Sequence, residues 1–215
     1  LLKSTFAAAP YDTTLFDALL EARRQHGGAH LVADDIDQQP LSYRGLITAS
    51  YALGSKIARR TKVSERVGVL LPTSRGALVT FFALQATGRV PAMLNFSAGP
   101  ASVKAACRGA EVSLILTSRR FVEKAKLDSL VSALGEQATI VYLEDVRAEI
   151  GVPTKIGALI RSLATGPRHR SERAHDPAVL AEPWTVPSRT MKLTDQELEE
   201  SARCEDRSLA HMQGL

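Results

Sequence analysis

Four short apolar runs, separated by stretches with helical periodicity, constrain the fold of this chain most strongly. The apolar runs lie at residues 67–71, 90–94, 113–116 and 140–143. The helical stretches between them lie near residues 77–87, 101–108 and 121–134. Strands that are apolar on both faces and alternate with helices form parallel sheets covered on each side. Because crossover connections are right-handed, the sequence predicts an α/β fold with a doubly wound, mostly parallel sheet of four or more strands.

Shorter elements are predicted before this alternation begins. Thr13 or Thr14 can cap a helix that carries an apolar stripe, and the glycines at 27–28 can end it. Two short strands are expected at residues 30–33 and 41–43. Ser42 can then cap a helix that runs to Arg60.

The texture of the sequence divides the chain into two parts. Residues 1–165 are expected to form the α/β subdomain, and residues 166–215 a linker and an atypical tail. Thr194 and Glu197 form a capping box for one short helix in that tail. Since the chain begins with leucine instead of methionine, we expect further residues upstream.

Composition argues against several classes of function. The net charge is +4, and the basic excess around residues 161–173 lacks the interleaved aromatic residues of a single-strand nucleic-acid site, so no nucleic-acid partner is expected. Cys107 and Cys204 lack metal-ligand spacing and predict a reducing, cytoplasmic setting. The five histidines likewise show no metal spacing. No apolar stretch reaches the roughly 18 residues of a membrane span.

Candidate binding residues follow from the predicted sheet, because ligands of open parallel sheets bind beyond the carboxyl ends of the strands. That rule selects the loops at residues 72–75, 95–97, 118–120 and 144–145. Ser74 reads most simply as a helix N-cap, and Arg75 beside it as either an anion contact or a solvated side chain. Asn95 can close a turn and Phe96 can fill the core, or both can contact a substrate. No residue is predicted to be catalytic, and no metal site is predicted.

Three segments carry a resemblance to a known family. They read VGVLLPTS at residues 67–74, FFALQA at 81–86 and GRVPAMLNF at 88–96. Their order resembles the N-terminal subdomain of the adenylate-forming superfamily, which contains acyl-CoA synthetases, adenylation domains and luciferases. The likeness spans residues 11–179.

Within that superfamily, the sequence is most similar to the acyl-ACP synthetase half of the bifunctional 2-acylglycerophosphoethanolamine acyltransferase/acyl-ACP synthetase. Residues 88–99, 117–123 and 141–146 carry this finer likeness. It implies an AMP-forming ligase of fatty acid and phospholipid metabolism that uses ATP and Mg²⁺ and passes an acyl group to a carrier protein or coenzyme A. It also implies that Asn95 and Phe96 lie near the acyl channel, and that a separate acyltransferase domain brings the parent protein to the inner membrane.

The resemblance fails where the family has its phosphate-binding loop. No glycine occurs between Gly166 and Gly214, although residues 176–179 match the family's Asp-Pro-Ala-Val sequence. A phosphate loop needs glycines, which allow backbone N–H groups to turn toward the anion, and a lysine that neutralises it. We therefore expect that this chain by itself binds no nucleotide and is an inactive, truncated N-terminal part of the ligase.

Two other interpretations stay open. The chain could be a non-catalytic α/β module that binds a carrier protein or a sister chain. A nucleotide-binding enzyme of Rossmann type is the third, and the absence of a Gly-x-Gly-x-x-Gly loop weighs against it. Under the first interpretation, a missing second subdomain would leave apolar surface uncovered, so we expect self-association.

Overall fold

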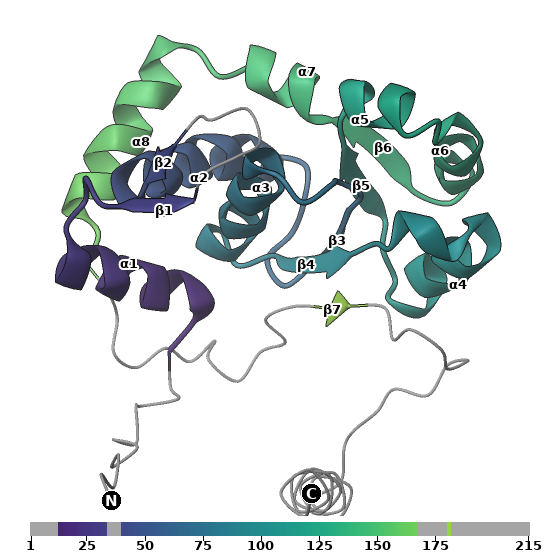
Figure 1. Ribbon diagram of the computed structural model, residues 1–215, viewed down its shortest axis with the longest axis horizontal. Coiled ribbons are helices and arrows are strands. Elements are labelled where there is room, and N and C mark those ends of the chain that lie inside the picture. Colours follow the sequence, from purple (N-terminus) through teal and green to yellow (C-terminus); the bar gives the residue numbers. More distant parts are fainter. Residues whose placement is uncertain (1–12, 34–39, 167–179, 182–215) are drawn as a thin grey trace, which may run out of the picture. The chain divides into compact units, whose positions relative to one another are not determined.

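The computed structural model describes residues 13–33, 40–166 and 180–181, and a five-stranded parallel sheet lies at its centre (Figure 1). The strands are β3 (Arg66–Val69), β4 (Val90–Met93), β5 (Leu114–Thr117), β6 (Thr139–Tyr142) and β7 (Leu180–Ala181). Their order is β6-β5-β3-β4-β7, and every neighbouring pair is parallel. Along the sequence, β3 is the first strand of this sheet and its neighbour β4 is the second. The chain then crosses past β3 and forms β5 on the other side of it. This confirms the predicted doubly wound fold.

The chain divides into two units, Leu1–Glu182 and Pro183–Leu215, and all described residues belong to the first. β7 falls within the segment 166–215 that was expected to be linker and tail. The expected domain boundary at residue 165 stays a prediction, and the capping box at Thr194 and Glu197 lies outside the described residues.

Side chains of the central strands alternate between the two faces of the sheet. Val67 and Val69 belong to the apolar cluster on one face, and Leu70 to the cluster on the other. Gly68 also faces the second cluster, where a Cβ atom would lie 2.9 Å from a carbon of Ile115. A larger residue at position 68 would therefore crowd the Ile115 side chain in the second cluster.

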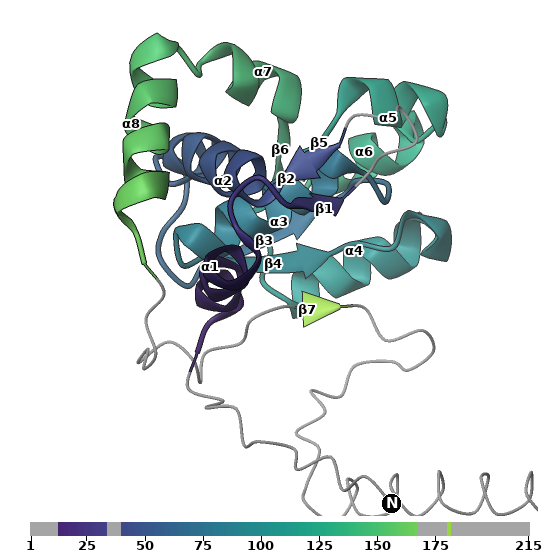
Figure 2. The ribbon, with the colours of Figure 1, turned by 60° about the vertical axis from the view of Figure 1, so that its left-hand side comes forward.

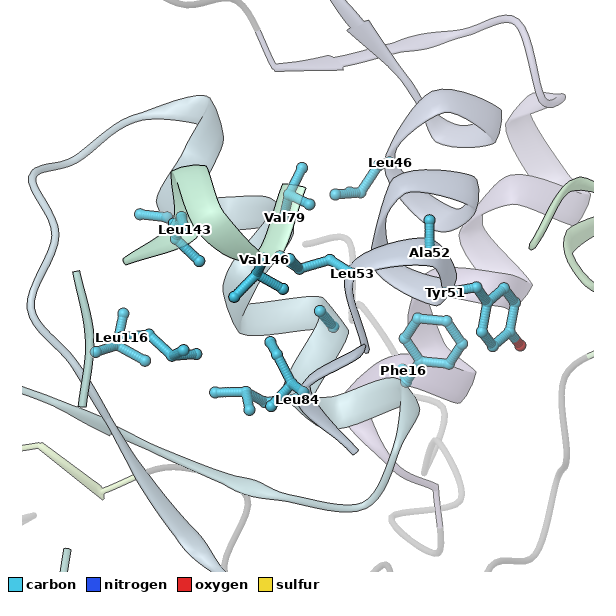
Figure 3. Close-up of a cluster of buried hydrophobic side chains, with 14 of the residues drawn as sticks. Phe16, Leu46, Tyr51, Ala52, Leu53, Val79, Leu84, Leu116, Leu143 and Val146 are labelled. Atoms are coloured by element: carbon cyan, nitrogen blue, oxygen red, sulfur yellow. The ribbon is translucent and has the colours of Figure 1, made fainter. Parts of the chain in front are cut away.

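Helices α1 (Leu15–His26), α2 (Tyr43–Ile57) and α3 (Arg75–Ala86) contribute to the larger cluster. Figure 3 shows their side chains pointing toward one another and toward Leu116 of β5. The T-shaped pair of Phe16 and Tyr51, with ring centroids 5.2 Å apart, closes its outer end. Two further helices, α7 (Leu143–Ala148) and α8 (Val152–Ala164), complete this layer.

Helices α4 (Pro100–Gly109), α5 (Arg119–Lys124) and α6 (Asp128–Gly135) cover the opposite face (Figure 1). Their contacts include the buried residues Val103, Cys107 and Leu134. Cys107 is thus a small buried core residue. Both faces of the central sheet are covered, so the exposed apolar side chains of the described part of the chain lie elsewhere.

Local signals set the beginnings of several helices. Thr14 caps α1 by accepting a hydrogen bond from the Asp17 amide at 3.1 Å, and Ser42 caps α2 through the Gly45 amide at 3.2 Å. Both caps confirm the sequence prediction. Strands β1 (Leu31–Ala33) and β2 (Leu41–Ser42) pair antiparallel just before α2.

The Gly88-Arg89 pair of the family motif has a structural role. Gly88 has a φ of +70° and follows the end of α3, in a conformation that glycine adopts without strain. Arg89 is 8% exposed and donates hydrogen bonds to the carbonyls of Ala58, Thr61 and Thr87. These carbonyls lie at or just beyond the ends of α2 and α3. Arg89 therefore joins the ends of two helices before β4 begins.

The single helix predicted over residues 121–134 is wrong, because the structure has two helices there. The helical conformation is interrupted at Lys126, whose φ is +54°. The Leu127 amide then donates a hydrogen bond to the Val122 carbonyl at 2.9 Å. This bend lets Val122 of α5 and Leu130 of α6 enter the same apolar cluster. Periodicity alone could not reveal it, since both halves keep helical spacing.

Helices α7 and α8 were not predicted from the sequence. Arg161 belongs to the basic excess around residues 161–173 and lies in the last turn of α8. Its guanidinium stacks over the Tyr51 ring, 4.5 Å from the centroid. Among the described helices, none has both the length and the apolar character needed to traverse a bilayer.

Candidate functional site

The carboxyl ends of β3, β4, β5 and β6 lie along one edge of the sheet, because the four strands are parallel and in register. This is the edge where a doubly wound sheet binds its ligands. All four candidate residues lie there: Ser74 and Arg75 after β3, and Asn95 and Phe96 after β4.

Ser74 is the N-cap of α3, as the sequence predicted. Its Oγ accepts a hydrogen bond from the Ala77 amide at 3.2 Å. Arg75 is the first residue of α3 and is partly buried. A Cβ atom added at Gly76 would lie 3.8 Å from the Arg147 guanidinium, so α7 brings a second cation close to this helix start.

Asn95 closes the turn after β4. Its Oδ1 accepts hydrogen bonds from the amide of Ser97 at 3.1 Å and from the hydroxyl of Ser97 at 2.7 Å. The short 3-10 helix η1 (Phe96–Ala98) follows directly. The turn-closing interpretation of Asn95 therefore has a direct structural counterpart, and whether Asn95 also contacts a substrate stays a prediction.

Phe96 is 39% exposed and is not enclosed in the core. Its ring meets the edge of Phe121 from α5 with centroids 5.2 Å apart and an interplanar angle of 79°. Such pairs are stabilising beyond their buried area. Phe121 is not among the site residues expected from the sequence. Its place in the first turn after β5 was the available signal.

Ser118 and Glu144 connect the ends of β5 and β6. Ser118 caps α5 and donates its hydroxyl hydrogen to Oε1 of Glu144 at 2.8 Å. Burial alone would raise the pKa of Glu144. The amides of Glu144, Arg119 and Arg120, together with the Ser118 hydroxyl, outweigh burial and hold the pKa below its usual range. Among the described residues, Oε2 of this carboxylate is buried without a hydrogen-bond partner.

Arg119 and Asp145 form a bidentate ion pair on the outside of the same edge. The two nitrogen–oxygen distances are 2.8 and 2.7 Å. The hydrogen bonds from Arg119 lower the pKa of Asp145. The Arg119 guanidinium also lies 4.3 Å from the centroid of the Tyr142 ring. The two charges of this exposed pair compensate each other without a ligand.

The structure thus brings together residues from neighbouring loops. Phe96 meets Phe121, Ser118 meets Glu144, and the Thr117 hydroxyl donates to the Leu70 carbonyl at 2.8 Å. A shallow hollow lined by residues 59–65 and Ser113 lies at the amino edge of the sheet, away from the candidate residues.

The described residues at the carboxyl edge of the sheet do not form a cradle for Mg²⁺ and a nucleotide. Within the part of the chain that the structure describes, no three His, Cys, Asp or Glu side chains gather in a metal-binding group. The carboxylates of Glu144 and Asp145 are already engaged by Ser118 and Arg119.

Known proteins provide a family comparison. The sequence profile of the family described as AMP-binding enzyme matches residues 20–181. That match covers three quarters of the chain.

Three solved structures share the fold. VinN in complex with 3-methylaspartate is 16% identical with a TM-score of 0.57, over 78% of this chain and 43% of VinN. The N-terminal subdomain of Klebsiella oxytoca NpsA is 15% identical with a TM-score of 0.53, over 66% and 34% of the two chains. Apo MatB from Rhodopseudomonas palustris is 19% identical with a TM-score of 0.53, over 65% and 28%. The matched region spans less than half of each of these proteins.

Proposed function

This chain belongs to the AMP-binding enzyme family, and we propose on that premise that it is the N-terminal part of an AMP-forming ligase. The family match over residues 20–181 carries this proposal. The β6-β5-β3-β4-β7 sheet, shared as a fold with adenylation enzymes, supports it. In this role the chain supplies the scaffold and one wall of the acid-binding channel.

The proposed substrate is a fatty acid, with ATP and Mg²⁺ as co-reactants and a carrier protein or coenzyme A as acceptor. The likeness of residues 88–99 to acyl-ACP synthetases motivates this choice. The proposed reaction joins the carboxylate to the α-phosphate of ATP and releases pyrophosphate, and a thiol then takes the acyl group from the acyl-adenylate, with loss of its proton and release of AMP. The groups that neutralise phosphate charge in such a reaction would come from segments other than those described here.

Phe96 and Phe121 are the proposed contribution of this chain to the acid-binding wall. Their rings meet at the carboxyl edge, and Phe96 keeps 39% of its surface exposed. An exposed apolar ring beside a fixed turn offers an acyl chain a surface to cover. The proposed setting of the reaction is the cytoplasm.

Fatty-acid-dependent exchange of pyrophosphate into ATP tests this function. The coding DNA is first read past Val179, and any longer product that carries a glycine-rich loop is expressed beside the 215-residue chain. We expect exchange by the longer product and none by the chain alone. Phe96→Ala in the longer product should raise the KM for the fatty acid by about ten-fold and leave the KM for ATP unchanged. Exchange catalysed by the 215-residue chain alone would contradict the proposal that it is inactive.

Self-association of the chain stays a separate prediction. Light scattering at micromolar concentration measures it directly, and a monomer that binds no hydrophobic dye would contradict it.

A further inference from the structure

Helix α8 presents its large apolar side chains to solvent and its small ones to the protein. Ala158 and Ser162 are buried against the neighbouring helices, at 6% and 0% exposure. The exposed apolar residues are Val152 (67%), Ile156 (53%), Leu159 (43%), Ile160 (61%) and Leu163 (64%). Five of the nine large apolar residues exposed in the described part of the chain therefore lie on this one helix.

These five residues form a continuous stripe, because spacings of three and four place side chains on one face of a helix. We call Val152, Ile156, Leu159, Ile160 and Leu163 the α8 stripe. It runs the length of a helix of about 20 Å. α8 lies at the outside of the described elements in both ribbon views (Figures 1 and 2).

The helix is held firmly from its other side. Ser162 accepts a hydrogen bond from the Thr48 hydroxyl at 3.0 Å, and Arg23 donates to the carbonyls of Ser162 and Thr165 at the end of α8. Arg161 stacks on Tyr51. The stripe is therefore exposed on a helix that is fixed to α1 and α2.

The charged residues of α8 itself have one sign. The helix contains no aspartate or glutamate, and its cations are Lys155 and Arg161. An apolar helix face beside basic residues is the pattern of helices that lie in the interface of an anionic membrane.

We propose that the α8 stripe seats this protein on an anionic lipid surface. The helix lies in the plane of the interface, with its apolar side chains at the boundary of headgroups and acyl chains and Lys155 at the phosphate level. This assignment does not depend on the proposed ligase function. It differs from the membrane contact implied by the resemblance, which was assigned to another domain.

Two other occupants of the α8 stripe fit less well. A second copy would bring two helices with only basic charges together. A protein partner is disfavoured because the stripe has no aromatic residue, although aromatic residues dominate the energetic centres of protein interfaces.

Cosedimentation of the 215-residue chain with vesicles tests the proposal. One vesicle type contains phosphatidylcholine and phosphatidylglycerol, and the other contains phosphatidylcholine alone. We expect binding to the mixed vesicles that weakens with salt, and much weaker binding to the neutral ones. Ile156→Ser with Ile160→Ser should lower the partition coefficient by at least about ten-fold. Lys155→Gln should lower it by about five-fold on mixed vesicles only.

Leu31→Ser is the matched control, since Leu31 is 59% exposed but belongs to β1. It should bind vesicles as the unchanged chain does. All variants should keep the unchanged chain's circular dichroism spectrum, because the substituted side chains are exposed. The proposal is overturned by absence of binding to mixed vesicles, or by equal binding of the double variant. Two further results would overturn the proposal. One is dimerisation that the double variant abolishes, and the other is binding of an acidic carrier protein without binding of vesicles.

Discussion

Arg89 illustrates how a single buried cation can organise backbone instead of binding a ligand. Its Nε donates to the Thr61 hydroxyl at 3.0 Å, and its two terminal nitrogens donate to the carbonyls of Ala58, Thr61 and Thr87. Charge-assisted bonds to helix-end carbonyls are favourable because those carbonyls lack partners within the helix. This accounts for the arginine of the family motif in structural terms.

Arg89→Ala should lower the free energy of unfolding by about 3 kcal/mol, because it leaves several buried carbonyls without donors. The free energy of unfolding of Arg89→Lys should lie between those of the alanine variant and the unchanged chain, since lysine keeps the charge but lacks the planar set of donors. Urea unfolding measures both variants. Equal stability of the alanine variant and the unchanged chain would show that these hydrogen bonds do not stabilise the fold.

Gly54 and Gly157 provide a matched test of helix packing. A Cβ atom at Gly54 in α2 would lie 2.7 Å from the Ala83 carbonyl oxygen of α3, whereas one at Gly157 in α8 meets nothing within 4 Å. Gly54→Ala should destabilise the protein by roughly 2 kcal/mol. Gly157→Ala should stabilise it by roughly 0.5–1 kcal/mol, the gain in helix propensity alone. Thermal unfolding measures the two shifts, and shifts of the same sign would contradict the close approach of α2 and α3.

The start of α5 shows how elements are joined at the carboxyl edge. Ser118 caps the helix, and Glu144 from the start of α7 places its carboxylate beside the first amides of α5. A negative charge at a helix N-terminus is favourable because the amides there are unpaired. Two short helices are thereby linked without a large apolar contact.

Glu144→Gln should destabilise the protein by about 1 kcal/mol at neutral pH. The folded pKa of Glu144 is depressed, so its contribution to stability is complete above the unfolded value of about 4.3 and is lost as the pH falls through the folded pKa. The difference between the variant and the unchanged chain should therefore shrink as the pH falls below about 4.3. Asp145→Asn, which removes the exposed pair with Arg119, should change stability much less. Melting temperatures of the variants and the unchanged chain, measured from neutral to acidic pH, test this expectation. A stability difference between Glu144→Gln and the unchanged chain that grows in acid would contradict the charge argument.

At the scale of the molecule, a covered parallel sheet is combined with an exposed apolar helix. The two clusters bury both faces of the sheet, while the α8 stripe remains outside them. At the carboxyl edge, polar side chains bond to one another or to nearby backbone: Asn95 closes a turn, Ser118 bonds to Glu144, and Arg119 pairs with Asp145. These features suit a scaffold that presents a surface to other groups.

The 215-residue chain should bind MgATP or NAD no better than about millimolar, because no glycine-rich loop follows a strand. Isothermal titration calorimetry with each nucleotide measures this. The longer product described above, if it is found, serves as the positive control for ATP. A micromolar dissociation constant for the chain alone would contradict the expectation.

Much of the fold and a smaller part of the candidate site followed from local sequence. The apolar runs predicted β3 to β6 within one or two residues, because burial on both faces of a strand requires apolar residues in succession. The caps at Thr14, Ser42 and Ser74 were predictable as well, because a capping side chain bonds an amide within three residues of itself. The turn at Asn95 is likewise a local feature.

Tertiary structure decided the features that join distant segments. The position of β7 beside β4, the break at Lys126 and the contacts of Phe96 with Phe121 and Ser118 with Glu144 depend on which elements pack together. The α8 stripe belongs to the same group. Its periodicity would fit a buried helix equally well, and only packing against α2 through Ala158 and Ser162 leaves the large side chains outside. Sequence by itself thus determined which segments are strands or helices, because those preferences are local, whereas the choice of partners and of the exposed face required the folded chain.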